Sequence, residues 1–240
     1  MPFGPLHRRV GVTLATVILA VAVLTAPAGA SDLDLLVFNS SDAGSSTFTT
    51  LGAKLAQRGE GPAMLLTVGG GARWQSFSRP AGGRMRARRF VLTTAAVFGA
   101  QWSLDQGTVG LFAGPESTLD LLTGSQGLSR EATGTGLRLQ PEIWLRPTGE
   151  TLLQATLVAS TSRRSVWTRV AGGVRLGEGY VGPEAGCYAD ATGYRKCFIG
   201  ANATDFTLAG RHLRLSIGGQ AETDIRRIQP YLGFAVWEDW

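Results

Sequence analysis

The chain has 240 residues, of which 44% are hydrophobic, 17% are charged and 33 are glycine. Glycine costs a helix about 1 kcal/mol per residue relative to alanine, so this composition argues against a helical protein, and the length is compatible with one domain. The formal charge is +5 for the whole chain and +3 for residues 31–240, which is only mildly basic, and the absence of a long lysine and arginine stripe argues against nucleic acid as a partner.

The first thirty residues have the pattern of a secretory signal peptide. Arg8 and Arg9 precede an apolar run over residues 10–24, and the small residues 28–30 fit a cleavage site. The run is shorter than the roughly twenty residues of a membrane-spanning helix, although an uncleaved anchor helix is an alternative. We predict a signal peptide at residues 1–30 and a single exported domain at residues 31–240.

From residue 31 onward, apolar and polar residues alternate with a period of two, as in β-strands. A weak first strand lies near residues 35–38, and a clearer one spans 46–58. After a turn, a third strand runs to a loop rich in serine, glycine and proline at residues 77–84. The basic run RMRARR at residues 84–89 predicts a solvated loop or strand end, or a contact with anionic lipid headgroups or polymer.

The middle of the chain contains the longest alternation. Residues 90–104 and 108–120 predict a hairpin, and residues 121–133 predict a second long loop. Residues 134–161 predict a further hairpin, in which apolar odd positions oppose polar even positions on both sides of the Thr148-Gly149 turn. The remaining strands are predicted at residues 165–176, 180–189, 194–205, 211–221 and 231–240.

These segments make about twelve strands of roughly ten residues, an even number and a length that crosses a bilayer when tilted. Tight turns alternate with longer, more charged loops, as at the two rims of an outer-membrane barrel. We therefore predict an all-β, antiparallel up-and-down β-barrel of the outer-membrane type, with the apolar face outside. The alternative is a soluble periplasmic barrel or sandwich, in which the apolar face is the core. The scarcity of lysine and glutamate on the polar face favours the membrane barrel.

Two cysteines, Cys187 and Cys197, flank a predicted hairpin turn at residues 190–193. Both have the apolar parity of their strands, and export would place them in an oxidising compartment. We predict a cross-strand disulfide, with two buried free thiols as the alternative.

The polar face contains a repeated Pro-Glu element, at residues 115–116, 141–142 and 183–184. Proline removes a ladder donor, so each should mark a bulge or local break that directs the glutamate inward. The predicted lumen-facing or polymer-facing residues are Glu116, Glu142, Glu184, Arg138, Arg169, Arg175 and Arg214. They would form either an ion-pair network that plugs the barrel or a polar lining for a sugar polymer or small solute. Nothing fixes two carboxylates at a glycosidase separation.

No pattern in residues 31–240 indicates a metal site, a cofactor or a convincing catalytic centre. One histidine, His212, lies on the same strand face as Ser216, but four residues along a strand span about 13 Å, beyond hydrogen-bond reach. We expect a non-enzymatic protein, and an outer-membrane lipid hydrolase is the alternative that this pair leaves open.

Four segments carry a resemblance to a known family. They are LVFNSSDAGSSTF (residues 36–48), LFAGPESTLD (111–120), LQPEIWLRPTGETLLQAT (139–156) and GYVGPEAGCY (179–188). With the signal peptide, they resemble the BcsS family of alphaproteobacterial cellulose biosynthesis proteins. The cysteine pair and the RMRARR run depart from what is expected of the family, and the resemblance supplies no active-site residues.

The resemblance implies an envelope protein at the outer membrane, linked to a cellulose synthase system. We expect an accessory barrel that assists export, anchoring or organisation of cellulose or another exopolysaccharide. Its expected partners are outer-membrane lipid, the polysaccharide and components of the synthase complex. The alternative is a soluble periplasmic binding module.

Overall fold

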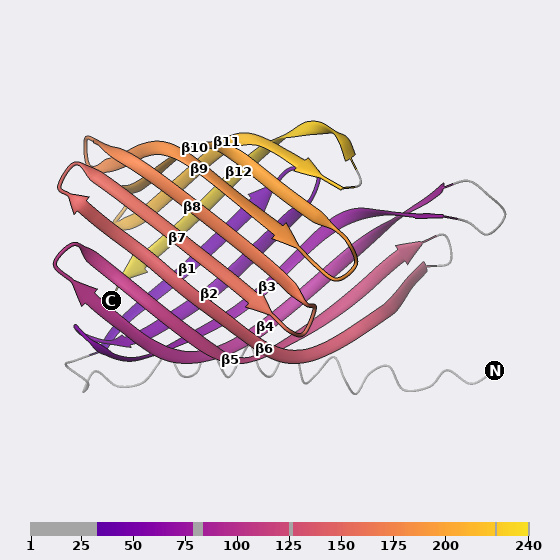
Figure 1. The fold of residues 1–240 in the computed structure, drawn as a ribbon, viewed down its shortest axis with the longest axis horizontal. Coiled ribbons are helices and arrows are strands. Elements are labelled where there is room, and N and C mark those ends of the chain that lie inside the picture. The colour runs from indigo at the N-terminus through magenta and orange to yellow at the C-terminus, as the bar shows by residue number, and fades with distance from the viewer. Residues whose placement is uncertain (1–32, 79–83, 125–126, 224, 240) are drawn as a thin grey trace. The chain divides into compact units, whose positions relative to one another are not determined.

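The structure, a computed structural model, describes residues 33–78, 84–124, 127–223 and 225–239. The predicted signal peptide lies outside these residues. The described chain forms twelve antiparallel strands, each paired with its neighbours in sequence, and β12 returns to pair with β1 (Figure 1). The strands are β1 (Leu33–Ala43), β2 (Thr47–Gln57), β3 (Gly61–Ser78), β4 (Arg84–Leu104), β5 (Gly107–Gly124), β6 (Gly127–Thr148), β7 (Thr151–Ser160), β8 (Ser165–Leu176), β9 (Gly179–Ala189), β10 (Arg195–Leu208), β11 (Arg211–Glu222) and β12 (Ile225–Asp239). Within the described ranges, no helix is long and apolar enough to cross a membrane.

The apolar side chains of the strands face outward. Phe98 is 58% exposed, Val170 52% and Ile217 64%, whereas polar residues of the opposite parity, such as Glu116 and Gln154, are buried. An exposed apolar wall around a polar interior is stable in lipid, and ring closure leaves no unpaired strand edge there. The predicted outer-membrane-type barrel is confirmed. The soluble alternative is wrong, because it requires the apolar face to be the core.

The predicted loop at residues 121–133 is wrong. β5 continues to Gly124 and β6 begins at Gly127, with ladder pairs along most of the interval. The basic run at residues 84–89 forms the beginning of β4 and pairs residue by residue with β3, so the strand-end alternative is correct and the loop alternative is wrong. The β3–β4 and β5–β6 hairpins continue beyond the ends of other strands (Figure 1). Backbone pairing is sufficient to hold such extensions, so they need no apolar alternation.

The two ends of the barrel differ. At the end where β1 begins and β12 ends, called the turn end here, short turns join the strands, and glycines with positive φ complete several of them, including Gly177 (62°) and Gly210 (79°). The opposite end, called the loop end, carries the other connections, including the Cys187–Cys197 hairpin loop. Short periplasmic turns and longer outer loops are the usual arrangement in outer-membrane barrels.

Aromatic rings on the inner face lie over glycines of the adjacent strand. Phe38 of β1 covers Gly52 of β2, and Phe198 of β10 covers Gly186 of β9, so that an added Cβ at either glycine would overlap the ring. These pairs fill the inner wall and fix its register without a continuous apolar core. A small apolar cluster also lies inside, over β2 to β5. It consists of Ala56, Ala63, Leu65, Ala95, Val97 and Phe112.

Candidate functional site

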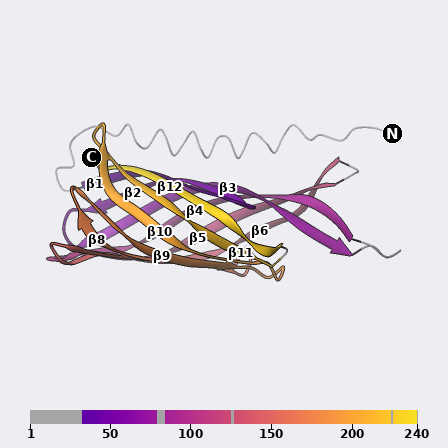
Figure 2. The same cartoon turned by 90° about the horizontal axis from the view of Figure 1, so that it is seen from above.

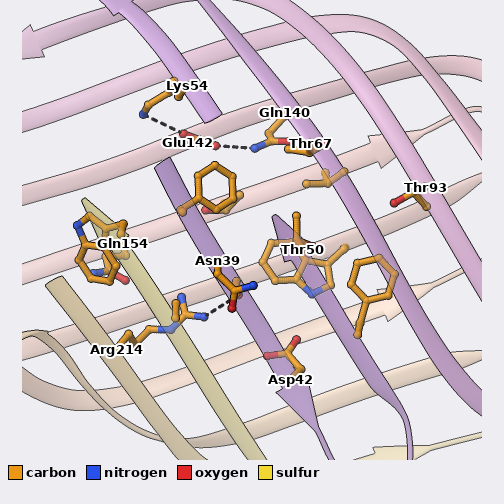
Figure 3. Close-up of a pocket in the computed structure, with 18 of the residues that line it drawn as sticks. Asn39, Asp42, Thr50, Lys54, Thr67, Thr93, Gln140, Glu142, Gln154 and Arg214 are labelled. Carbon is orange, nitrogen blue, oxygen red and sulfur yellow. Dashed lines mark hydrogen bonds and ion pairs between the residues drawn. The ribbon is translucent and has the colours of Figure 1, made fainter. Parts of the chain in front are cut away.

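The barrel encloses a cavity of about 890 Å³ lined by polar and aromatic side chains. Figure 3 shows Glu142 between Lys54 and Gln140, with Asp42 and Arg214 on other parts of the lining. These residues occupy inward-facing positions of their strands, so the alternation places all of them on the lumen side of the wall. The aromatic lining is Phe38, Phe48, Trp144, Trp167, Tyr188, Tyr194, Phe198 and Trp237.

Two predicted glutamates, Glu116 and Glu142, belong to one polar chain across the cavity. Lys54 Nζ lies 3.5 Å from Glu142 Oε2, and the Gln140 amide donates to Glu142 at 2.5 Å. The Gln140 oxygen in turn accepts from Arg138 Nε at 2.8 Å, and Arg138 Nη1 lies 3.6 Å from Glu116 Oε2. Lys54 is on β2 and Glu142 is on β6, so this chain joins strands that are four positions apart in the ring.

Each Pro-Glu element coincides with a short break in a ladder. Two residue pairs are missing at Pro115 between β4 and β5, at Pro141 between β6 and β7, and at Pro183 between β8 and β9. The register is unchanged across each break, so the proline removes a donor without shifting the strand. The following glutamate therefore keeps the inward parity. These are local breaks and not bulges.

The third predicted glutamate, Glu184, lies in the packed wall and does not line the cavity. It is 2% exposed, and its Oε2 accepts from Arg169 Nε at 3.0 Å and Nη2 at 2.7 Å. Arg169 Nη1 also donates to Gln154 Oε1 at 2.9 Å. Arg169 and Glu184 thus face inward as predicted, but they form a buried ion pair between β8 and β9.

The other two predicted arginines differ in position. Arg214 lines the cavity and donates to Ser40 Oγ at 3.4 Å, while its buried Nε has no hydrogen bond to any described residue. Arg175 has to be corrected: it is exposed at the turn end and donates to the backbone oxygens of Gly177 and Gly149. Its parity is inward, but it stands one residue before the end of β8 and therefore lies at the rim.

At the loop end, ion pairs join opposite walls. This loop-end belt consists of Arg73, Arg89, Asp120, Arg163 and Asp190. Asp190 Oδ2 lies 3.3 Å from Arg73 Nη2 and 3.2 Å from Arg163 Nη2, and Asp120 Oδ2 lies 2.8 Å from Arg89 Nη2 and 3.5 Å from Arg163 Nε. Arg73 is on β3 and Asp190 directly follows β9, six positions away in a ring of twelve.

The loop-end belt stabilises the charged form of Asp190. Burial alone would raise the pKa of the Asp190 carboxyl, but hydrogen bonds from Thr192 and the charges of Arg73 and Arg163 outweigh burial and lower the pKa below 3.8. The carboxylate form is therefore favoured by the fold. Arg73 is also held by Tyr194, whose ring centroid lies 3.7 Å from the guanidinium carbon.

At the turn end, aromatic rings join opposite walls. The Trp144 and Trp237 ring centroids are 5.6 Å apart in an edge-to-face arrangement, although Trp144 is on β6 and Trp237 is on β12, again six positions apart. A circular twelve-stranded barrel would be roughly 24 Å across, more than two indoles bridge. The two walls therefore approach each other at this level, and the barrel is thinner in the view of Figure 2 than in that of Figure 1, as expected for an oval cross-section.

His212 and Asp205 complete this turn-end belt together with Arg146, Trp144 and Trp237. The His212 ring stacks on Trp237 at 5.6 Å, and its Nδ1 lies 2.9 Å from Asp205 Oδ1. Arg146 Nη2 donates to Asp205 Oδ2 at 2.6 Å. Asp205 sits in a bulge with a φ of 64°, which turns its carboxylate toward these partners.

Sequence reasoning missed both belts. The tryptophans Trp144, Trp167 and Trp237 lie at polar-parity positions, which was the available signal for lumen aromatics. Asp205 carried a weaker signal, since aspartate tolerates positive φ better than most residues. Nothing in the sequence indicates which inward residues meet across the ring.

The cysteine prediction is confirmed. Cys187 and Cys197 are a directly opposed pair on β9 and β10 and form a disulfide. The pair has the outward parity and closes the loop that carries Asp190, so it supports the loop-end belt from outside.

Within the described ranges, His212 and Ser216 do not form a hydrogen-bonded pair. His212 contacts Asp205 and Trp237, and the buried Ser216 Oγ has no hydrogen bond to His212 or to any other described residue. Among the described residues, no group of three histidine, cysteine or acidic side chains is arranged to hold a metal ion.

The closed ring, the exposed apolar wall and the polar, internally bridged lumen define an outer-membrane β-barrel of the cell envelope. Its sequence identifies it further. The chain belongs to the family described as cellulose biosynthesis protein BcsS, whose family model matches residues 36–240. No curated protein matches the sequence of this chain significantly.

Solved structures with a similar fold include two autotransporter domains and a porin. The translocator domain of NalP from Neisseria meningitidis is 12% identical with a TM-score of 0.48, over 96% of this chain and 95% of that one. The β-domain of Bordetella BrkA is 14% identical with a TM-score of 0.45, over 86% and 98%. The KdgM porin, solved with disordered oligogalacturonate, is 8% identical with a TM-score of 0.43, over 85% and 98%.

Proposed function

We propose that this barrel is a non-enzymatic accessory of cellulose biosynthesis that anchors or organises the polymer at the outer membrane, and that the polymer does not pass through its lumen. The family supports the link to cellulose. The single observation that carries the rest is that opposite walls touch at both ends of the lumen, through Trp144 and Trp237 at one end and Arg73 and Asp190 at the other.

These contacts argue against an open conduit. A glucan chain needs a continuous path, and such a path would require both belts to separate. At the loop end that would strip the nearly buried Asp190 side chain, 1% exposed, of its arginines. Breaking a buried ion pair costs several kcal/mol, so the bridged state is the resting state.

Planar-bilayer conductance tests the sealed lumen. We expect the wild-type barrel to give only small currents, and the double variant Trp144→Ala/Trp237→Ala to give larger ones because it removes the turn-end contact. The matched control is Trp102→Ala, which removes an exposed, outward-facing indole. A large, steady wild-type current that cello-oligosaccharides block would overturn the proposal.

The role in the cell is tested by deletion in the native bacterium. We expect total glucan synthesis to persist while the fraction retained on the cell surface falls. Restoration by the wild-type gene and by the double tryptophan variant would support a role outside the lumen. Accumulation of glucan in the periplasm would instead identify an export conduit, and unchanged retention would exclude anchoring.

A further inference from the structure

The exposed charges of the barrel are divided between its two ends. Among the side chains that the structure describes, no exposed aspartate or glutamate lies at the loop end. The exposed acidic residues, all near the turn end, are Asp34, Glu60, Asp105, Glu150, Glu178 and Asp239. The loop end exposes arginines instead, namely Arg86, Arg88, Arg164, Arg195 and Arg227.

Acidic side chains of the loop end lie buried inside the barrel. Glu222 is 7% exposed and accepts hydrogen bonds from Ser45, Ser46 and Gln220. Asp120 and Asp190 are buried in ion pairs with Arg73, Arg89 and Arg163. The charges of Asp120 and Asp190 are therefore balanced locally, and among the described side chains the exposed charges of this end are all positive.

We propose that the outward face of the β3–β4 hairpin binds phosphate groups of anionic lipid in the membrane leaflet around the loop end. Arg86 and Arg88 alternate with Ala87 and Arg89, which are 1% and 7% exposed and face inward. Arg86 and Arg88 thus project from the wall that faces lipid and not into the mouth of the lumen.

Both arginines lie against aromatic rings at the edge of the apolar wall. The guanidinium carbon of Arg86 is 5.6 Å from the Trp74 ring centroid, and that of Arg88 is 5.2 Å from the Phe90 centroid. Trp74 is 46% exposed and has the same outward parity as Phe90. Such stacking holds the guanidinium plane while leaving its N–H groups directed away from the ring. Aromatic side chains also mark the membrane interface in barrels, which is the depth of lipid phosphate.

The chemistry favours a phosphate-bearing lipid over a polysaccharide. Arginine binds phosphate through two parallel N–H donors, and the exposed cations that the structure describes at this end are all arginines. Cellulose carries no charge, so it gains nothing from this patch. An acidic polysaccharide would meet the mouth of the lumen, where the cations are already paired.

The test measures binding of bisphosphorylated lipid A to the full barrel in uncharged detergent. We expect the exposed-surface variant Arg86→Gln/Arg88→Gln to bind lipid A roughly thirtyfold more weakly. Each basic residue near an anionic surface usually strengthens binding by roughly five- to sixfold, and the variant removes two of them. The matched control Arg175→Gln/Arg211→Gln removes two exposed arginines of the turn end and should leave binding unchanged. Inorganic phosphate should compete, and dephosphorylated lipid A should bind weakly to every form.

Equal lipid A binding by the wild type and the Arg86/Arg88 variant would overturn the proposal. So would loss of polygalacturonate binding in this variant with lipid A binding intact, since that would identify an acidic polymer as the partner. Bilayer conductance and cellulose retention report on the lumen and on the proposed function, and both should be unchanged in this variant.

Discussion

Replacing Arg169 with methionine should destabilise the barrel by about 3–5 kcal/mol, because it leaves the Glu184 carboxylate buried without its cation. Glu184 is 2% exposed, and its Oε1 has no hydrogen bond to any described residue, so both of its strong contacts come from Arg169. The pair does not line the cavity, and water is therefore not at hand to replace the guanidinium. The single variant Glu184→Gln should cost less, since Gln154 still accepts from Arg169.

The double variant Arg169→Met/Glu184→Gln should cost clearly less than the sum of the two single variants, by about 1–3 kcal/mol. The free energy of unfolding would be measured by urea titration of the barrel in phospholipid vesicles, followed by tryptophan fluorescence and by loss of the compact band on unheated gels. Arg175→Met, an exposed arginine on the same strand, is the control and should change stability by under about 0.5 kcal/mol. The reasoning is refuted if Arg169→Met costs no more than this control, or if the two single costs simply add.

Three further predictions concern other contacts. Gly52→Val should cost about 1–3 kcal/mol by driving a side chain into the Phe38 ring, and Phe38→Ala should partly rescue it in the same urea titration. Because the fold lowers the pKa of Asp190, its ion pairs stabilise the barrel fully above pH 3.8, and this stability is lost as the pH falls through the lower pKa of the folded state. Asp190→Asn should therefore flatten the acid side of a plot of unfolding free energy against pH. An unchanged acid side would contradict this. Reduction of Cys187–Cys197 should cost about 2–3 kcal/mol, whereas a Cys187→Ala/Cys197→Ala variant should be insensitive to reductant.

Much of the fold followed from the sequence because the side-chain period of a strand is fixed. The inward and outward parities predicted for residues such as Phe98, Glu142 and Ile217 all agree with the structure. The error at residues 121–133 has a physical cause: where a hairpin extends past its neighbours, backbone hydrogen bonds hold the strands, and glycine, serine and threonine in that segment resemble a loop.

The site was less predictable than the wall. Parity states that Lys54 and Glu142 face the lumen, but their 3.5 Å contact depends on strand stagger and on the oval cross-section of the closed ring. The same applies to Trp144 and Trp237. The prediction for Arg175 fails for a different reason. Parity shows which face of the strand a residue is on, but not whether its position lies beyond the end of the lumen.

The contact between Trp144 and Trp237 also constrains how the molecule is assembled. Trp237 belongs to β12, the strand whose pairing with β1 closes the ring, and Tyr231 of the same strand donates to Asp42 of β1 at 3.4 Å. Before β12 docks, the indole of Trp144 has no opposite wall to meet. The β1–β12 seam and the contact between Trp144 and Trp237 therefore form in the same step.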